Sequence, residues 1–353
     1  MDDGTVARPF VPEHQAGNIM PDAASVAAMG NDENTSSLTT PSRFATWIRL
    51  VRPSALLLVL LPALTALALL WIRGATILVL PALAGVIGLT FIQAGASLLD
   101  VFLEYARRLD VAHSRRRDQL TAHALLAHAR IRQVTVLTVS IVLMLLGVVA
   151  SIPLIAVGGG PVMAVGVAAV GIAFLSLVMS FILRRYSLAN LFIGLALGPG
   201  VVSVMILAQH QMPTSGDLLI AGSLGLLAML PTEAAHLRDA DQDRREGRRT
   251  LVTVMGDTVG RAVYVFIVLA AMALLAVAAV PQGAPHGALL GFFALPAFSI
   301  PISGVLRASP GDARAQIVAQ ELRAYAIFAF WLLVGLALNA ILIYGLGPIP
   351  PAV

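Results

Sequence analysis

Cysteine and lysine are both absent from this 353-residue chain, and only 12% of its residues are charged. The absence of cysteine excludes disulfides and thiolate metal sites. Hydrophobic residues make up 58% of the chain, the mean hydropathy is +0.87, and the apolar runs are long enough to cross a hydrocarbon core of about 30 Å. The composition therefore predicts a protein that crosses a membrane several times.

Clusters of Arg, Gly, Pro and polar residues divide the apolar sequence into nine predicted spans. The predicted spans cover residues 54–72, 76–99, 133–152, 162–183, 188–208, 217–237, 261–280, 288–306 and 324–345. The predicted fold is an all-α membrane domain of about nine transmembrane helices within residues 45–353. Residues 1–44 are rich in Asp, Asn, Ser, Thr and Pro and lack the basic start and apolar core of a signal peptide, so we expect a disordered cytoplasmic tail.

The distribution of arginine predicts the orientation of these spans. All 23 basic residues are arginine, and nearly all lie in the connections after spans two, four, six and eight; the other connections carry only Arg73. Because cytoplasmic loops are enriched in positive charge, the N-terminus is predicted to be cytoplasmic and the protein to lie in the cell inner (cytoplasmic) membrane. Membrane topology and lipid headgroups account for the pI near 10.1, so no nucleic-acid partner is expected.

The segment AHLRDADQDRREGRRTLVTVMG, residues 235–256, follows the sixth predicted span and carries the strongest chemical signal. Asp239 and Asp243 are four residues apart, which on a helix places both carboxylates on one face. Arginines surround them: Arg238, Arg244, Arg245, Arg248 and Arg249. Carboxylates can hold a divalent cation and arginines can bind a polyphosphate, so this pattern favours a site for Mg²⁺ and diphosphate.

A second acidic pair lies at the end of the second predicted span. Asp100 and Glu104 also share the i, i+4 spacing, and Asp110 and the arginine-rich loop that contains Arg115 follow them. Each pair lies at the cytoplasmic end of an even-numbered span and precedes a basic connection. We therefore expect the two pairs to form one site.

At these residues the chain resembles the UbiA superfamily of membrane prenyltransferases. The segment from residue 235 is similar to the pattern N-N-x-R-D-x-x-x-D-x-x-x-G-K-x-T-L of the 1,4-dihydroxy-2-naphthoate branch. The residues that match it include Asp239, Asp243, Gly247, Thr250 and Leu251. Trp47, Arg49, Arg52 and Pro53 resemble the W-x-x-x-x-R-P start of the first helix, and Gly198-Pro199 agree in span five.

The first acidic motif is degenerate with respect to Q-x-G-x-N-L-A-N-D-Y-F-D-Y-x-x-G-x-D of the same branch. Gln93, Gly95, Tyr105 and Asp110 are retained. The departures are Ser97 and Asp100 in place of the two Asn, Val101 in place of an Asp, and Glu104 in place of the last Asp of the cluster. In the second motif the Asn pair is Ala235-His236, and Arg248 replaces Lys. Val101 removes one possible metal ligand, while the other changes keep polar or charged groups.

The resemblance implies a helical bundle around a central cavity, Mg²⁺, a polyprenyl diphosphate donor and a prenyl acceptor that is usually aromatic, as in menaquinone synthesis. It implies that Asp100, Glu104, Asp239 and Asp243 are the metal ligands. Other roles would follow: Arg238, Arg248 and Arg115 would contact phosphate, Asp110 would orient the basic loop, and Arg52 would contact the acceptor. Membrane lipid is expected to surround the spans.

Several alternatives remain open from the residues alone. The acidic pairs could be solvated helix ends paired with local arginines, the loop arginines could be topological anchors, and Arg52 could extend to the headgroup region. Asn190, Gln93 and Ser97 could contact the acceptor or form interhelical hydrogen bonds, and Glu233 could line the cavity. The rival functions are a terpene cyclase of the same superfamily, a membrane carrier and a catalytically inactive homologue.

Overall fold

The computed structural model describes residues 43–109, 131–181, 186–245, 247–280, 285–307 and 316–344. Within these ranges the chain forms helices and turns and no β-strand. Nine helical segments of this described part are long and apolar enough to cross a membrane, which confirms the predicted all-α membrane fold. The expected tail, residues 1–44, lies almost wholly outside the described residues.

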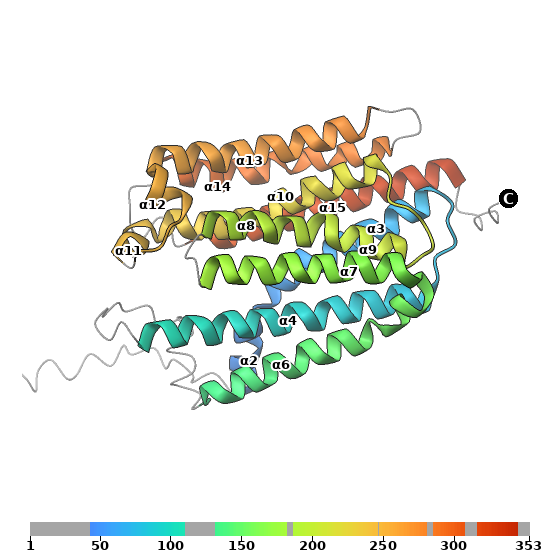
Figure 1. The fold of residues 1–353 in the computed structure, drawn as a ribbon. Helices are drawn as coiled ribbons and strands as arrows, with labels where there is room; N and C mark the ends of the chain where they lie inside the picture. The colour runs from blue at the N-terminus through green and yellow to red at the C-terminus, as the bar shows by residue number, and fades with distance from the viewer. Residues whose placement is uncertain are drawn as a thin grey trace, which may run out of the picture. The chain divides into compact units, whose positions relative to one another are not determined.

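The long helices run side by side along a common axis (Figure 1). The first half contains α2 (Arg43–Val51), α3 (Pro53–Ile72), α4 (Val79–Leu109), α6 (Gln133–Ala150) and α7 (Ile152–Phe181). The second half contains α8 (Tyr186–Leu195), the π-helical turn η1 (Ala196–Gly200), α9 (Val201–Leu207), α10 (Ser215–Arg238), α11 (Ala240–Arg245), α12 (Leu251–Met255), α13 (Asp257–Ala278), the 3₁₀ helix η2 (His286–Ala294), α14 (Leu295–Arg307) and α15 (Ile317–Tyr344). We call the end of the bundle that carries α11 and α12 the α11 end.

Two helices differ from the predicted spans. Helix α4 continues to Leu109, beyond the predicted end at residue 99, so Asp100 and Glu104 lie on the same helix as the span. Residues 153–161, which lie outside the predicted spans, are helical and belong to α7. The helix bends within this segment at Gly159 (φ 62°, ψ −148°), a conformation that glycine adopts without a steric penalty.

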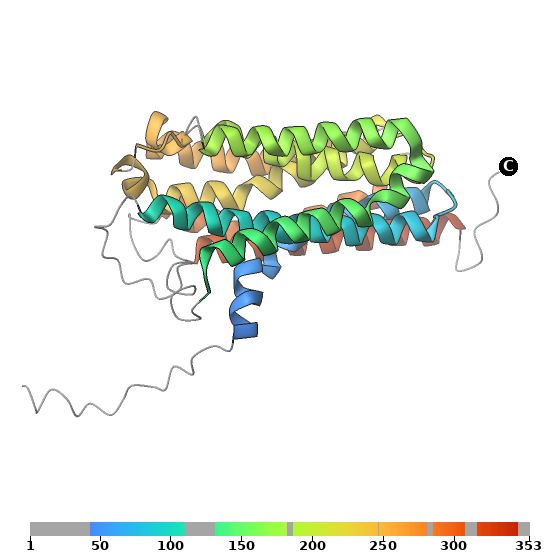
Figure 2. The same ribbon diagram turned by 60° about the horizontal axis from the view of Figure 1, so that its bottom comes forward.

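Helix α2 belongs to a small hydrophobic cluster that is separate from the main core. Leu50 of α2 packs with Leu98 and Val101 of α4 and with Val136 of α6. The main core is contributed chiefly by α3, α9, α10, α13, α14 and α15, with Tyr264, Phe298 and Phe328 among its largest fully buried side chains. The half of α4 that carries Asp100 is therefore held by α2 and α6, while the central helices pack among themselves. In Figure 2, α2 lies across the direction of the long helices.

Helices α8 and α10 cross with their backbones in contact. A Cβ atom added at Gly225 of α10 would lie 2.4 Å from the carbonyl oxygen of Gly194, and one added at Gly198 would lie 2.2 Å from that of Ala221. Only glycine permits so close an approach. The sequence Gly198-Pro199 also falls in η1, where the helix widens into a π turn.

At the end of the bundle opposite the α11 end, polar contacts of Arg73 link two helices. Arg73 directly follows α3. Its guanidinium forms an ion pair with buried Asp217 and donates hydrogen bonds to the Met212 carbonyl (3.2 Å) and to Thr214 Oγ1 (3.0 Å). Thr214 and Asp217 form a capping box at the start of α10. The only arginine predicted on this side of the membrane therefore joins α3 to α10.

The orientation of the bundle can be tested with single cysteines, because the natural chain has none. Gln211 precedes α10 and Arg245 ends α11, so the two residues lie at opposite ends of the bundle, and both are exposed. We expect Arg245→Cys to react with a membrane-impermeant maleimide only in inside-out vesicles, and Gln211→Cys only in intact cells. The reverse labelling pattern would contradict a cytoplasmic α11 end.

Candidate functional site

The second acidic motif forms a bend and a short helix at the end of α10. Asp239 interrupts the helix (φ −97°, ψ 12°), yet the backbone bonds continue through it: the Asp239 amide donates to the Ala235 carbonyl and the Asp243 amide donates to the Asp239 carbonyl, each at 2.9 Å. The predicted spacing of one turn is therefore present. The two side chains differ in environment, because 41% of the Asp239 side chain is exposed and only 2% of that of Asp243.

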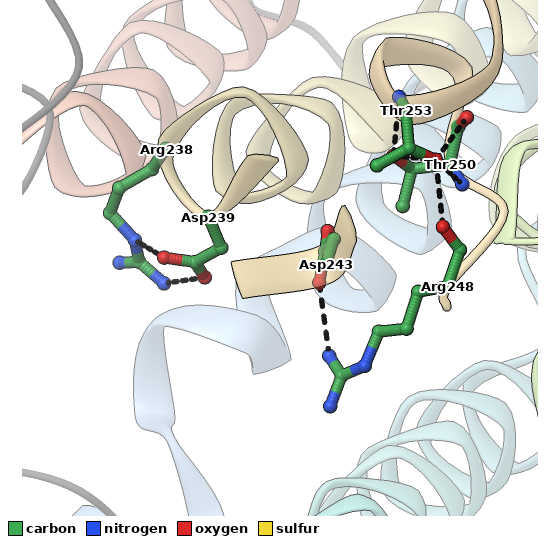
Figure 3. A network of polar contacts seen from close by, with 6 residues as sticks. All are labelled: Arg238, Asp239, Asp243, Arg248, Thr250 and Thr253. Atoms are coloured by element: carbon green, nitrogen blue, oxygen red, sulfur yellow. Dashed lines mark hydrogen bonds and ion pairs between the residues drawn. The ribbon is translucent and has the colours of Figure 1, made fainter. Parts of the chain in front are cut away.

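Each of these two carboxylates is paired with an arginine (Figure 3). Arg238 donates from Nε and Nη2 to the two oxygens of Asp239 at 2.9 and 2.8 Å, a bidentate arrangement. Arg248 donates from Nη1 to Oδ1 of Asp243 at 3.4 Å. Asp241, which the spacing places on another face, pairs with Arg244 in an exposed position. Each of these three carboxylates therefore has an arginine partner within the motif, which contains more arginines than carboxylates.

The turn after α11 brings Arg248 back to Asp243. Gly247 adopts a positive φ of 66°, and the Arg248 amide donates to the Asp243 carbonyl at 2.9 Å. A left-handed residue just after a helix is the usual place for glycine. The Gly at this position of the motif therefore has a structural role, because it turns the chain so that the side chain of residue 248 can reach the carboxylate of residue 243.

Thr250 and Thr253 hold the other side of this turn. Thr250 caps α12, its Oγ1 accepting from the Thr253 amide at 3.2 Å, and Thr253 Oγ1 in turn donates to the Arg248 carbonyl at 2.7 Å. Thr250 is fully buried. The Gly-Arg-x-Thr-Leu part of the motif is thus a hydrogen-bonded turn that positions the backbone of Arg248.

The first acidic motif lies at the same end of the bundle. Both views place the last turns of α4 at the α11 end (Figures 1 and 2). Asp100 is exposed on α4. Glu104 follows one turn later on that helix, in a stretch whose side chains the structure does not describe. Asp110 and Arg115 lie outside the described residues.

The described side chains contain no group of three or more acidic or histidine residues close enough to hold one metal ion. The two acidic pairs therefore share one end of the bundle, but the common ion predicted from them stays a prediction. Arg52, the predicted acceptor contact, is exposed between α2 and α3 in a left-handed conformation (φ 54°, ψ 73°). Such a conformation is uncommon for a residue other than glycine, above all before a proline.

A buried polar pair lies deeper in the bundle, between α8 and α10. Asn190 Nδ2 donates to Glu233 Oε1 at 2.8 Å and to the Met229 carbonyl at 3.1 Å. His236 Nδ1 lies 3.6 Å from the other oxygen of Glu233. The sequence identifies Asn190 and Glu233 as separate polar residues within the spans, but no spacing rule connects residues on different helices.

One buried pair has no counterpart in the sequence analysis. Tyr264 of α13 donates a hydrogen bond to Glu321 of α15, and both side chains are fully buried. A glutamate near the start of an apolar span is a detectable signal, because carboxylates inside membranes need partners. This pair joins α13 to α15 within the packed core.

Residues 59–333 match the family model described as the UbiA prenyltransferase family. Since the match covers more than half of the chain, the protein belongs to the UbiA prenyltransferase family, a class of membrane-embedded enzymes. No curated protein matches it significantly by sequence.

Solved structures support the same fold. A UbiA homolog from Archaeoglobus fulgidus bound to DMAPP and Mg²⁺ has a TM-score of 0.56 and 15% identity, covering 83% of this chain and 99% of that one. The same homolog bound to GPP and Mg²⁺ gives a TM-score of 0.52 with the same identity and coverage. A digeranylgeranylglyceryl phosphate synthase gives 0.51 at 16% identity, with 83% and 98% coverage. At these identities the likeness concerns the fold alone.

The ion pair of Asp243 and Arg248 should matter for stability, because the side chain of Asp243 is buried and that of Arg248 is only 28% exposed. We expect Arg248→Met to lower the free energy of unfolding by about 1–2 kcal/mol, less than the loss of a fully buried partner costs. Arg244→Met, which breaks an exposed pair, should change it by less than about 0.5 kcal/mol. Thermal unfolding in detergent compares the two variants, and equal losses would contradict a special role for the Asp243 pair.

Proposed function

We propose that the protein transfers a prenyl group from a polyprenyl diphosphate to an aromatic acceptor within the membrane, with Mg²⁺ as cofactor. The observation that carries this proposal is the bent Asp239–Asp243 motif with its arginines, located at one end of an apolar bundle in a chain of the UbiA prenyltransferase family. The donor joins a long apolar tail to a highly charged head. A bundle of membrane helices suits the tail, and the charged α11 end suits the head.

The residues at this end fit a magnesium ion. Mg²⁺ prefers oxygen ligands, is commonly bound through one or two carboxylates and retains several waters. Asp239 and Asp243 supply two carboxylates one helical turn apart, and Asp100 and Glu104 would supply others from α4. A homolog of the same fold, solved with Mg²⁺ and DMAPP or GPP, supports this assignment.

The arginines would contact the diphosphate. Arg238 and Arg248 form ion pairs with these carboxylates, so they would exchange partners when the donor and the cation bind. Each guanidinium would turn to phosphate oxygens as its carboxylate turns to the cation, which keeps every charge paired. Arg115 would add a further phosphate contact, with Asp110 orienting its loop, and Arg52 would face the acceptor.

The reaction breaks the bond between the prenyl C1 and its diphosphate oxygen, and the electron pair leaves with the diphosphate. Bound Mg²⁺ would neutralise charge on this leaving group. Arg238 and Arg248 would stabilise the same charge through hydrogen bonds. A nucleophilic ring carbon of the acceptor then forms the new carbon–carbon bond with C1 and the ring loses a proton.

We further propose that the acceptor is of the 1,4-dihydroxy-2-naphthoate type, as in menaquinone synthesis, and that the α11 end faces the cytoplasm of a bacterial-type inner membrane. The match of the second motif to that branch supports the acceptor class, and the arginine-rich connections at the α11 end support the orientation.

Product analysis tests the proposed reaction. Purified protein with Mg²⁺, isoprenyl diphosphates of several lengths and a panel of aromatic acceptors should yield a prenylated aromatic detectable by mass spectrometry. We expect Asp239→Asn to lower turnover by about 100-fold or more, as the loss of one electrostatic stabiliser commonly does.

Asp241→Asn is the matched control, because Asp241 lies two residues after Asp239 in the same motif, and 63% of its side chain is exposed. It should retain most activity. Full activity of Asp239→Asn would show that Asp239 has no part in the mechanism. A cyclised hydrocarbon formed without an acceptor would show that the protein is a terpene cyclase and not a prenyltransferase.

The partner exchange predicts that the two ligands bind cooperatively. Mg²⁺ alone has to displace an arginine from a carboxylate and leaves that arginine without an anion. When inorganic pyrophosphate is also present, the carboxylate pairs with Mg²⁺ and the guanidinium pairs with the pyrophosphate. We expect the double variant Arg238→Met, Arg248→Met to bind Mg²⁺ alone about tenfold more tightly than the natural protein and to gain less from pyrophosphate, as isothermal titration calorimetry can measure.

Arg244→Met serves as the control for removing one positive charge near the site. In Arg244→Met, the difference between the Mg²⁺ affinity measured without pyrophosphate and that measured with pyrophosphate should be the same as in the natural protein. An unaltered affinity for Mg²⁺ in the double variant would contradict the exchange.

A further inference from the structure

Asn190 and Glu233 form a polar pair in a part of the bundle where unpaired charge is costly. Asn190 is 1% exposed and Glu233 is 5% exposed, and both lie in segments that can span the membrane. A carboxylate at such a place is expensive unless it has partners or a function. Within the described residues Glu233 has one hydrogen-bond donor, Asn190, and one nearby ring, that of His236.

The hydrogen-bonding capacity of Asn190 is half used. Its amide group donates to two acceptors, the Met229 carbonyl and Glu233 Oε1, so a flipped amide would place oxygen against oxygen. The orientation of the amide is therefore determined by its neighbours. Its Oδ1 atom is buried and has no hydrogen-bond partner among the described residues. A buried acceptor of this kind costs free energy until a donor reaches it.

The remaining capacity of the pair is entirely for accepting hydrogen bonds. Asn190 offers Oδ1, and the carboxylate of Glu233 offers oxygens only. A ligand that fits these atoms has to donate hydrogen bonds, as a hydroxyl does; a carboxylate, a phosphate or a ketone does not. The side chain of Glu233 keeps 7% of its surface exposed, so the pair is not completely sealed.

The position of Glu233 relative to the charged motif constrains how the acceptor would lie. Glu233 and Asp239 are six residues apart along α10, about 9 Å at 1.5 Å per residue, and Glu233 is on the side toward the middle of the span. The diphosphate of the donor would lie at Asp239 and its first carbon just inside. A group held near Glu233 would therefore lie about 9 Å deeper along the helix axis than Asp239, on a side of α10 turned by about 120° from it, so the acceptor would have to reach around the helix to the reacting carbon.

We propose that Asn190 and Glu233 bind a hydroxyl group of the prenyl acceptor and thereby select hydroxylated aromatic substrates. This inference rests on the proposed prenyl transfer and adds the recognition of the acceptor. Asn190 holds the Glu233 carboxylate in place, and the acceptor hydroxyl donates to the oxygens that the pair leaves available.

The test compares two substrates in two proteins. The substrates are the panel acceptor that the natural protein prenylates fastest and the mono-O-methyl ether of that acceptor, which is nucleophilic but has lost one hydrogen-bond donor. The natural protein should prefer the free hydroxyl by about tenfold or more in kcat/KM, in the range for a hydrogen bond to a charged group. In Glu233→Gln this preference should fall to about threefold or less, mainly through a higher KM for the hydroxylated acceptor.

Asn190→Ala should reduce the same preference, which supplies a second variant if Glu233→Gln folds poorly. In both variants the KM for the prenyl diphosphate and the affinity for Mg²⁺ with pyrophosphate should change by less than about twofold, because the charged motif is intact. A merely structural role would move all of these quantities together.

Glu321→Gln is the matched control, since Glu321 is another buried glutamate in a span, bonded to Tyr264 instead of to Asn190. It should keep the natural preference. An equal preference in the natural protein and Glu233→Gln, or an equal loss in Glu321→Gln, would overturn this inference while leaving prenyl transfer intact. Absence of any prenylated product from the natural protein would overturn the proposed function itself, and this inference with it.

Discussion

The ion pair between Asp243 and Arg248 is the interaction on which the charged end of the bundle depends. A buried carboxylate next to an apolar core is stabilised by a positive partner, because leaving it alone costs free energy, about 1–2 kcal/mol for a pair as partly exposed as this one. The partner comes from a turn five residues later, in which Gly247 adopts a positive φ and Thr253 Oγ1 donates a hydrogen bond to the Arg248 carbonyl. Backbone geometry and charge balance are therefore satisfied by the same short segment.

The same arrangement shows how two carboxylates are accommodated at the end of an apolar bundle. Arg238 and Arg248 pair with Asp239 and Asp243 within one motif, so each of the two carboxylates has a positive partner close to it in the sequence. The two pairs differ in exposure, which gives the site one accessible carboxylate and one that is held in place. A metal site assembled this way would be preformed in position while its charge is satisfied locally.

Much of the fold could be predicted from the sequence, because an apolar run of 20 residues with few charges has few uses outside a membrane. The number of spans is confirmed within the described residues, with shifted bounds for α4 and α7, and membership of the UbiA family is confirmed, while the branch of the family stays a proposal. The environment of Asp239 and Asp243 could not be predicted: their spacing fits one helical face, but the bend after Arg238 and the return of Arg248 depend on tertiary contacts. The bond between Asn190 and Glu233 joins different helices, so neither residue alone indicates it. The convergence of Asp100 and Glu104 on the same ion stays a prediction, and Asp110 and Arg115 lie outside the described part of the chain.

The close backbone contact between α8 and α10 at their glycines limits how substrate preference can change in this protein. Where main chain rests on main chain, as at Gly194 and Gly225, the separation of the two helices is set by backbone dimensions and cannot shrink. Asn190 and Glu233 project from these same two helices. A change of substrate preference near Asn190 and Glu233 would therefore arise from substitution of individual side chains on α8 and α10. It would not arise from a change in the distance between the two helices.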